Sequence, residues 1–357
     1  MKKTLLTFTG SAGLLLLPSL LSATTPAASI RFAPEAGTTV TKRFTTVTEM
    51  SLDDLDMLMN GEDAGAMMPQ IDMDLTMEQG LVIKDTYIES ADGRPVQLSR
   101  HFAEVGQDTT MDMSMEMMGE TQEQSQDMPA TSDLEGTTVL FSWNADGEEY
   151  EKEFAEESAG EDEDMLDGLA EDMDLRCLLP SGDVSEGDEW DIPMENIVDF
   201  LAPGGDLSWD VEIEGMDSMA GMGGNPEMMS NLREMMGDIE GEARAQFTGM
   251  ESGMAVIEIT IQIDTAQDMT ELMEAAMAET PAPMMPSIDR VDIELEVEGR
   301  GKMLWNTRAG HVGSVAFEAE MAVAMDMEMS LDTGQAPMTI ETSFAMSGTI
   351  ETAVETE

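Results

Sequence analysis

Apolar and polar residues alternate with a period of two along most of the chain. Successive side chains of a β-strand point to opposite faces, so this alternation predicts strands with one apolar and one solvated face, as in antiparallel sheets. The clearest runs lie at residues 71–77, 209–213, 257–263, 291–297 and 315–331. Turn-forming pairs lie between such runs, at Asp92-Gly93, Asp146-Gly147 and Thr333-Gly334.

Helix formers at helical spacing occur in only a few short segments. Ser51 is a favourable N-cap and Gly61 a favourable stop, while Pro226 and Pro281 mark the start of one segment and the end of another. The predicted helices are residues 51–60, 161–175, 226–236 and 266–279. Two segments without a clear periodicity, 119–132 and 215–225, are predicted to be loops.

Together these patterns predict a mainly β fold, with a curved antiparallel sheet or half-barrel and a few short helices. The acidic segment 156–180 is predicted to be a linker or helix between two groups of strands, at 24–155 and 181–357. The two groups form either separate units or one continuous domain, because about 330 residues suffice for both arrangements.

The N-terminus has the layout of a secretory signal peptide. Lys2 and Lys3 precede a largely apolar stretch at residues 5–21, and Ala23 is a small residue at which signal peptidase would cut. We therefore expect residues 1–23 to be removed and the mature protein to be secreted or periplasmic. No later run approaches the ~18 apolar residues of a membrane helix. Aromatic residues make up only 4% of the chain, too few for the two girdles of a membrane barrel.

The chain is strongly acidic, with 75 Asp and Glu against 16 Lys and Arg and a formal charge of −59. Such a surface repels nucleic acid and anionic membranes, and it attracts cations diffusely. No acidic run has the Asp-x-Asp-x-Asp-Gly spacing of a dedicated calcium loop. We therefore expect the acids to keep the protein soluble in salty surroundings, without a specific cation site.

Candidate catalytic and metal-binding residues are few. The two histidines, His101 and His311, lie in strand and turn sequences, without a nucleophile motif or His/Cys partners around them. Cys177 is the one cysteine and has partly apolar neighbours, so it is predicted to be a small buried side chain with no internal disulfide. We predict no catalytic residue, no cofactor and no metal site, and hence a protein that is not an enzyme.

Methionine is unusually frequent, with 38 residues. Two clusters place methionines at alternate positions of a predicted strand, and hence on one face. The first is Met111, Met113, Met115 and Met117, followed by Met118, and the second is Met325, Met327 and Met329. Thioethers that converge in this way could bind a soft ion such as Cu(I). The same spacing fits flexible filling of a buried apolar face, which we favour because no His, Cys or Trp joins either cluster.

Three groups of short motifs follow one another along the chain. The first is an opening strand at residues 39–50. The second, in the middle of the chain, consists of Leu179-Pro180, Val184, Gly187-Asp188 and Trp190. The third consists of Gly301, Trp305 and Gly310, which precede a long strand at residues 312–331. In this succession the chain resembles a family of uncharacterised exported bacterial β-rich proteins, a domain of unknown function. The resemblance covers most of the chain after residue 23 and implies an exported β protein, with no catalytic residues to carry over. By analogy alone, a curved sheet with helices on one side is similar to the half-barrels of periplasmic lipoprotein carriers such as LolA.

The sequence therefore favours a non-catalytic role, either the binding of an apolar or amphiphilic ligand or an interaction at the cell envelope. The alternative is a methionine-based protein that binds a soft metal such as copper or buffers oxidants. No motif identifies a protein partner.

Overall fold

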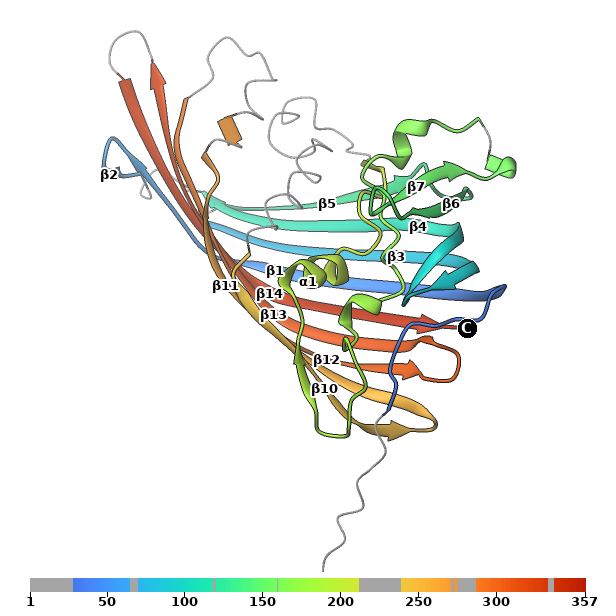
Figure 1. The fold of residues 1–357 in the computed structure, drawn as a ribbon. Helices are drawn as coiled ribbons and strands as arrows, with labels where there is room; N and C mark the ends of the chain where they lie inside the picture. The colour runs from blue at the N-terminus through green and yellow to red at the C-terminus, as the bar shows by residue number, and fades with distance from the viewer. Residues whose placement is uncertain are drawn as a thin grey trace, which may run out of the picture.

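The computed structural model describes residues 28–64, 70–117, 120–158, 160–211, 239–270, 273–274, 287–332 and 337–357. These residues form one antiparallel sheet of 14 strands, which is curved and not closed into a barrel (Figure 1). The predicted fold class, mainly β with a curved antiparallel sheet and a few short helices, is confirmed. Among the described residues, no helix combines the length and the apolar character needed to cross a membrane.

The strands are β1 (Thr38–Met59), β2 (Glu62–Asp63), β3 (Gln70–Ala91), β4 (Arg94–Met117), β5 (Glu120–Ser132), β6 (Thr138–Asn144), β7 (Glu149–Phe154), β8 (Glu189–Asp191), β9 (Trp209–Val211), β10 (Gly241–Glu251), β11 (Met254–Asp268), β12 (Ser287–Asn306), β13 (His311–Asp332) and β14 (Pro337–Thr356). Their order across the sheet is β7-β6-β4-β3-β1-β14-β13-β12-β11-β10-β8, and β5 continues the ladder from β4 to β9. Because β1 pairs with β14, strands on both sides of residues 156–180 belong to the same sheet.

We define the inner face of the sheet as the face against which the helix α1 (Met194–Leu201) packs. The ring of Phe200 in α1 meets the ring of Phe317 in β13 edge-on, with centroids 5.2 Å apart. Residues in register on neighbouring strands share a face. By this register, the apolar positions of the predicted runs at 71–77, 257–263, 291–297 and 315–331 all belong to the inner face.

The segment 156–180 also packs on the inner face. It contains three short 3₁₀ helices, η2 (Glu156–Ser158), η3 (Glu163–Leu166) and η4 (Arg176–Leu178), joined by turns. Its apolar side chains are buried in the main core: Leu166, Leu169, Met173, Leu175 and Leu178. This segment and α1 therefore cover one half of the long strands (Figure 1).

Several residues of the motifs that resemble exported β proteins support this packing. Gly301 lies under the ring of Phe317, where an added Cβ would come within 2.9 Å of the ring. Gly310 has a φ of 72° and approaches the backbone of Ala33 closely enough that a Cβ there would lie 2.4 Å from it. The buried indole of Trp305 donates to the carbonyl of Arg31 at 3.3 Å. These positions hold the turn-rich end of the sheet together.

The helix predicted at 51–60 is wrong, because this segment is the second part of β1. The pairing of β1 with β14 shifts register between Leu52 and Asp54, which marks a β-bulge. The bulge places Leu52 and Leu55 on the same face although they are three residues apart. Apolar residues three apart are also typical of a helix, so the spacing in this strand is the same as that of a helical segment.

The helix predicted at 161–175 is also wrong. Only the 3₁₀ helix η3 forms there, and the rest of the segment is turns. Gly168 and Leu175 adopt positive φ angles of 70° and 59°, which interrupt any α-helix. Acidic side chains accept hydrogen bonds from backbone N–H groups, as Asp162 does from Asp164 and Asp174 does from Arg176, and such bonds favour turns.

The loop predicted at 119–132 is wrong for residues 120–132, which form β5 and pair with β4 from Glu120 to Thr131. For the helix predicted at 266–279, β11 continues to Asp268 and helical residues appear at Thr270, Met273 and Glu274; residues 275–279 lie outside the described residues. The predicted loop 215–225, the helix 226–236, the turn at Thr333-Gly334 and the predicted signal peptide also lie outside them.

Candidate functional site

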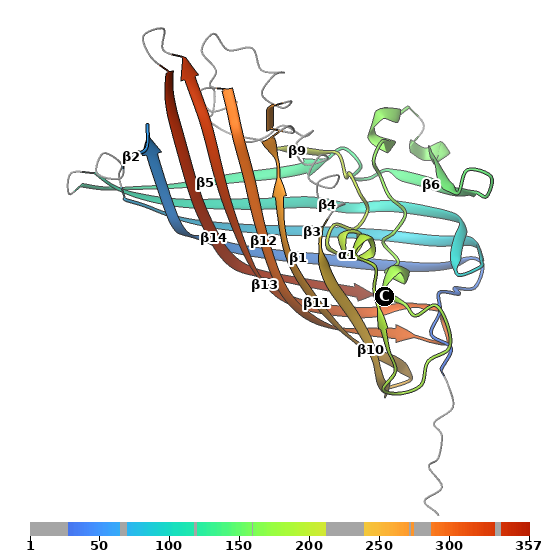
Figure 2. The same ribbon diagram turned by 60° about the vertical axis from the view of Figure 1, so that its left-hand side comes forward.

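The long strands extend well beyond the segments that cover them, as the upper ends of β12, β13 and β14 show (Figure 2). We call this part the far half of the sheet: residues 50–59 of β1, 70–77 of β3, 109–117 of β4, 287–297 of β12, 321–332 of β13 and 337–350 of β14. Twenty half-buried apolar residues on the inner face of this part form what we call the methionine face, next to the buried Ile288, Val291 and Val297. The residues of the methionine face are Met50, Leu52, Leu55, Met57, Ile71, Met73, Leu75, Met111, Met113, Met115, Ile293, Leu295, Met321, Val323, Met325, Met327, Met329, Ile340, Phe344 and Met346.

The methionine face is less covered than the rest of the inner face. Under α1 and residues 156–180, inner-facing residues are almost fully buried, with Ile83 0% and Phe317 4% exposed. Every residue of the methionine face is only half-buried, and the neighbouring Met59 is 37% exposed. No residue of this face is charged. The far half therefore presents an apolar inner surface that other parts of the described chain cover incompletely.

The two predicted methionine clusters lie on this same face but on different strands, β4 and β13, with β3, β1 and β14 between them. Met73 lies directly opposite Met113. Met325 instead lies between Ile293 and Phe344. Met327 and Met329 pack against a small buried cluster that includes Val291. The structure does not bring the two clusters together, and most of their neighbours are aliphatic or aromatic.

Uncharged polar residues border the methionine face. Four of them form a row across neighbouring strands where the far half meets the covered half: Thr352, Thr46, Gln79 and Gln107. Others lie opposite the flanking strands, Gln122, Gln124 and Gln126 on β5 and Thr265 and Gln267 on β11. In the described part of the chain, the Nε2 atom of Gln267 is buried and has no hydrogen-bond partner. We call these nine residues the polar frame.

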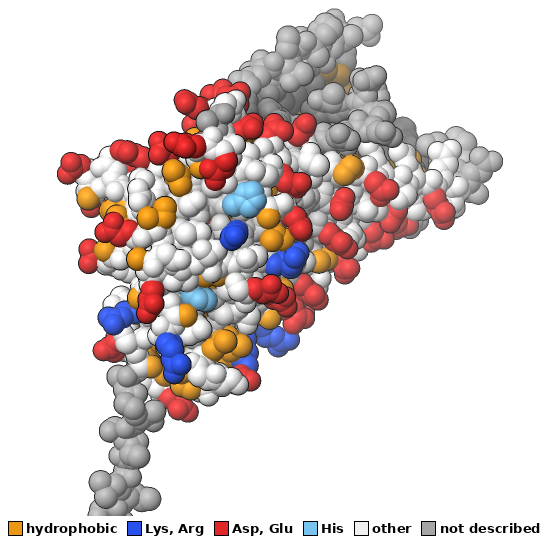
Figure 3. Space-filling model, turned by 90° about the vertical axis from the view of Figure 1, so that its right-hand side faces the viewer, with side chains coloured by type: hydrophobic (Ala, Val, Ile, Leu, Met, Phe, Trp, Pro, Cys, Tyr) orange, Lys and Arg blue, Asp and Glu red, His pale blue; other side chains and the backbone are white. Residues whose placement is uncertain are grey.

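The outer face of the far half carries the acids. Glu294 and Glu296 alternate with inner-facing residues along β12, and Asp326 and Glu328 do so along β13. In the described far half, Arg290 is the one Lys or Arg. Lys and Arg gather instead toward the other end of the strands, as the lower part of the surface in Figure 3 shows. The far half is thus an amphipathic sheet with an acidic outer face and an uncharged inner face.

Shallow depressions on the outer face contain charges of both signs. Near β12, Arg300 and Lys302 line one of them together with acidic residues. Lys302 already lies 2.7 Å from Glu251, and Arg300 lies 3.8 Å from Glu318. These cations are paired with carboxylates, so we assign no binding site to this surface.

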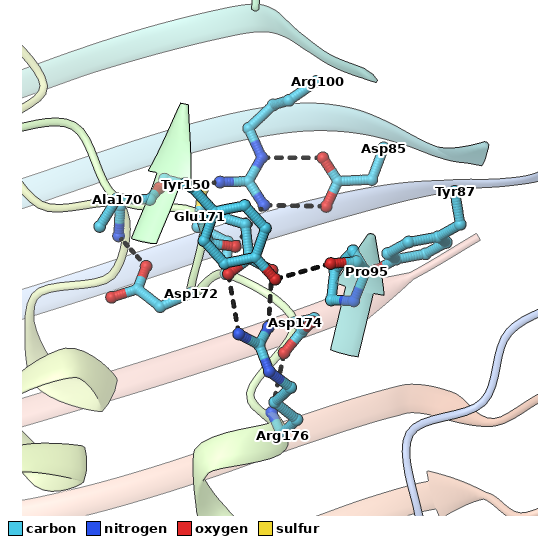
Figure 4. Close-up of polar contacts among 12 residues, drawn as sticks. Asp85, Tyr87, Pro95, Arg100, Tyr150, Ala170, Glu171, Asp172, Asp174 and Arg176 are labelled. Atoms are coloured by element: carbon cyan, nitrogen blue, oxygen red, sulfur yellow. Dashed lines mark hydrogen bonds and ion pairs between the residues drawn. The ribbon is translucent and has the colours of Figure 1, made fainter. Parts of the chain in front are cut away.

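A second notable feature is an ionic cluster buried in the covered half (Figure 4). The Asp85 carboxylate lies 2.7 Å from Lys42 Nζ and 2.8 Å from Arg100 Nε. Lys42 also donates to the hydroxyl of Tyr87 at 2.9 Å. All four side chains are fully buried. Three adjacent strands, β1, β3 and β4, each contribute to the cluster, so it lies at the centre of their packing.

The cluster joins the sheet to residues 170–176. Lys42 donates to the carbonyl of Met173 at 3.1 Å, and Arg100 donates to the carbonyls of Ala170 and Glu171 at 3.2 Å. Arg176 in turn holds the side chain of Glu171 through two bonds of 2.6 and 2.8 Å and that of Asp174 at 2.6 Å. Lys42, Arg100 and Arg176 are thus each paired with at least one carboxylate here.

Burial and pairing oppose each other in the pKa values of this cluster. Burial alone would raise the pKa of Asp85, but the charges and hydrogen bonds of Arg100 and Lys42 lower it below its ordinary value. Burial raises the pKa of Glu171 to about 7; Arg176 opposes this rise and Asp174 adds to it. Burial also raises the pKa of Tyr87, with a further contribution from Asp85. Asp85 is thus ionised at neutral pH, and Tyr87 keeps its proton.

Because its members on the sheet are fully buried, a substrate in solution does not reach this cluster, and its evident effect is to attach residues 170–176 to the sheet. This cluster was not predicted from the sequence, although the sequence contains a signal for it. Lys42, Asp85 and Arg100 each occupy the apolar phase of an alternating strand, between apolar residues two positions away on either side. A charged residue at such a position needs a buried partner of opposite charge.

The other predicted residues are dispersed. His101 and His311 each bond to backbone carbonyl groups, of Thr137 at 3.0 Å and of Val312 at 2.7 Å. Figure 3 shows histidine at two separate places on the surface. Burial raises the pKa of Cys177, with a further contribution from Asp174, so its thiol stays protonated at neutral pH. Within the described ranges, no group of three His, Cys, Asp or Glu side chains could hold a metal ion.

Comparisons with known proteins give little further information. No protein-family model matches the chain, and no curated protein matches its sequence. An outer membrane channel from Pseudomonas putida F1 aligns with 9% identity over 92% of this chain and 98% of its own, with a TM-score of 0.18. The secretin-domain β-barrel of a Salmonella injectisome aligns with 10% identity over 90% of this chain and 63% of its own, with a TM-score of 0.13. At such scores neither likeness carries an argument about fold or function, and the resemblance to exported β-rich proteins stays a prediction.

Proposed function

We propose that this protein binds the apolar chain of a ligand on its methionine face, without catalysing a reaction, and that it acts outside the cytoplasm. The observation that carries the proposal is the uncharged, half-buried apolar face of the far half. Soluble proteins seldom leave a continuous apolar surface of this kind open unless something binds to it. Methionine side chains are flexible and polarisable, so they adapt to chains of varied shape.

Binding of the neutral apolar dye Nile red tests the proposal. The dye should fluoresce with wild-type protein, and Phe344→Glu should weaken its binding about tenfold or more, because it places a charge in the apolar face. Ser343→Glu is the matched control, since it adds the same charge to the adjacent outer-facing position. Both variants should keep the wild-type circular dichroism spectrum.

Two results would contradict the proposal. One is equal dye binding by wild type and Phe344→Glu. The other is a wild-type dimer that Phe344→Glu converts to monomers, because a second copy of the chain would then be what covers the methionine face.

The location outside the cytoplasm rests on the predicted signal peptide. Mass spectrometry of protein from its native host should find a mature N-terminus near Thr24. Recovery of the intact Met1 form from the cytosol would contradict this part of the proposal.

Soft-metal binding or oxidant buffering remains the second candidate. The observation that favours it is the direct opposition of Met73 and Met113, with Met111 and Met115 on the same face of β4. Its test is a titration of the protein with Cu(I) under reducing conditions.

A further inference from the structure

We infer that the ligand of the methionine face is an amphiphile with an uncharged head group that forms hydrogen bonds, such as a glycerol ester of a fatty acid. This inference rests on the proposed function and specifies the class of ligand. It comes from the polar frame, which consists entirely of amide and hydroxyl side chains.

The polar frame meets the apolar surface at three margins. Along the margin nearest the covered core, Gln79 on β3 lies directly opposite Gln107 on β4, so two amide side chains stand next to each other. Gln107 donates a long bond, 3.4 Å, to the hydroxyl of Thr109. Amides both donate and accept hydrogen bonds, so this pair fits the hydroxyl and ester oxygens of a neutral head group.

Gln267 gives a second, independent indication. It lies in register with Ile293 and Met325, at the β11 margin of the methionine face. The Nε2 group of its amide is buried and, among the described residues, has no hydrogen-bond partner. A buried donor without an acceptor is unfavourable, and a carbonyl or hydroxyl oxygen of a ligand would supply the missing acceptor.

The distribution of charge excludes the common alternative, an anionic head group. The polar frame contains no cation to pair with a carboxylate or phosphate, and Arg290 is the one described cation of the far half. Acids lie on the outer face of the same strands, where they would repel an anion brought to this part of the sheet. A neutral head group meets hydrogen-bonding partners here without that repulsion.

The experiment compares two ligands of equal chain length, monolauroylglycerol and laurate, as competitors of bound Nile red at a pH where laurate is ionised. Each is used below its micellar concentration. Monolauroylglycerol should compete with an apparent Kd about tenfold lower than that of laurate. Wild-type protein that binds Nile red but binds laurate as tightly as the glycerol ester would overturn the inference and leave the proposed function standing. Absence of Nile red binding would instead overturn both.

Variants of the polar frame locate the head group. The double variant Gln79→Leu/Gln107→Leu and the single variant Gln267→Leu should each bind Nile red as wild type does. At least one of these variants should bind monolauroylglycerol about tenfold more weakly than wild type does, and that variant marks the position of the head group. Gln262→Leu is the matched control, because Gln262 lies on the outer face of β11. Unchanged affinity for monolauroylglycerol in both variants would overturn the inference, as would an equal loss in the control.

Discussion

Like charges lie in register on the outer face, and we therefore predict that salt stabilises this fold. Acids lie directly opposite one another in four ladders, β3/β4, β11/β12, β12/β13 and β13/β14, with two pairs in each and eight in all. The pairs are Asp74–Asp112, Glu78–Asp108, Asp264–Glu296, Asp268–Asp292, Asp292–Asp326, Glu298–Glu320, Glu318–Glu351 and Glu328–Glu341.

Four of these pairs include an acid next to a cation, since Arg290 contacts Asp292 and faces Glu328, and Arg300 lies 3.8 Å from Glu318. Each of the remaining four pairs destabilises the sheet by roughly 0.2–1 kcal/mol, which gives about 1–4 kcal/mol in total. Raising the ionic strength from ~0.01 M to ~1 M shortens the screening length from about 30 Å to about 3 Å and should remove most of this repulsion. For a chain of this size, the melting temperature should rise by roughly 1–6 °C.

Thermal melts followed by circular dichroism over this range of NaCl measure the effect. The double variant Asp108→Asn/Glu320→Gln removes one acid from each of two pairs. It should melt higher than wild type at low salt and gain less from added NaCl. Asp146→Asn, in the turn between β6 and β7, removes an acid outside these ladders and serves as the control. A flat or falling melting temperature in wild type would refute the reasoning, as would equal salt dependence in wild type and the double variant.

Three further predictions concern the ionic cluster and the methionines. Asp85→Asn leaves two buried cations without their carboxylate and should lower the free energy of unfolding, measured in urea, by about 3–5 kcal/mol. Glu104→Gln removes an exposed ion pair and should lower it by at most about 1 kcal/mol. Similar losses in the two variants would contradict our description of the cluster. Burial raises the pKa of Glu171 to about 7 in the folded protein, above its value in the unfolded chain. Glu171 therefore contributes its full stabilisation at pH values below the unfolded pKa, and this contribution is lost as the pH rises through about 7. Urea midpoints of wild type should therefore fall more than those of Glu171→Gln between about pH 5 and about pH 8, and parallel curves would show that Glu171 does not titrate there. Cu(I) titration under reducing conditions should show no tight stoichiometric binding. A submicromolar affinity that is lost when Met111, Met113 and Met115 become leucine would favour the metal-binding alternative.

The sequence predicted well those strands in which apolar and charged residues alternate strictly, such as residues 257–263 in β11. It failed where the alternation was broken or absent. The bulge next to Leu52 produced a helix-like spacing inside β1. The strand β5 has polar residues on both faces, such as Gln124 and Ser125, and is recognisable only through its hydrogen-bonded neighbour β4. Pairing between strands is a tertiary interaction, which a reading of local periodicity does not contain.

The candidate site could be predicted in part. Period-two spacing correctly placed the methionines of each cluster on one face of a strand. It could not show that the apolar positions near Phe317 are covered while those near Met325 are only half-buried. That difference depends on where residues 156–201 return to the sheet, which is not encoded in β13 itself. The alternation of apolar and polar residues is enough to predict that Lys42, Asp85 and Arg100 face the core. It does not show that these three side chains pair with one another.

The pairing of β1 with β14 has a consequence for how the protein acquires its fold. The strand β14 lies in the middle of the sheet, so contacts such as Lys42 with Thr356 join residues that are far apart in the sequence. Such non-local contacts slow folding, because a very long loop must close before they form. Until β14 is available, β1 and β13 each have an open hydrogen-bonding edge, which can pair with other chains. The sheet is therefore completed only after β14 has been synthesised, and a chain without β14 would be left with two separate arrays of strands whose free edges promote aggregation.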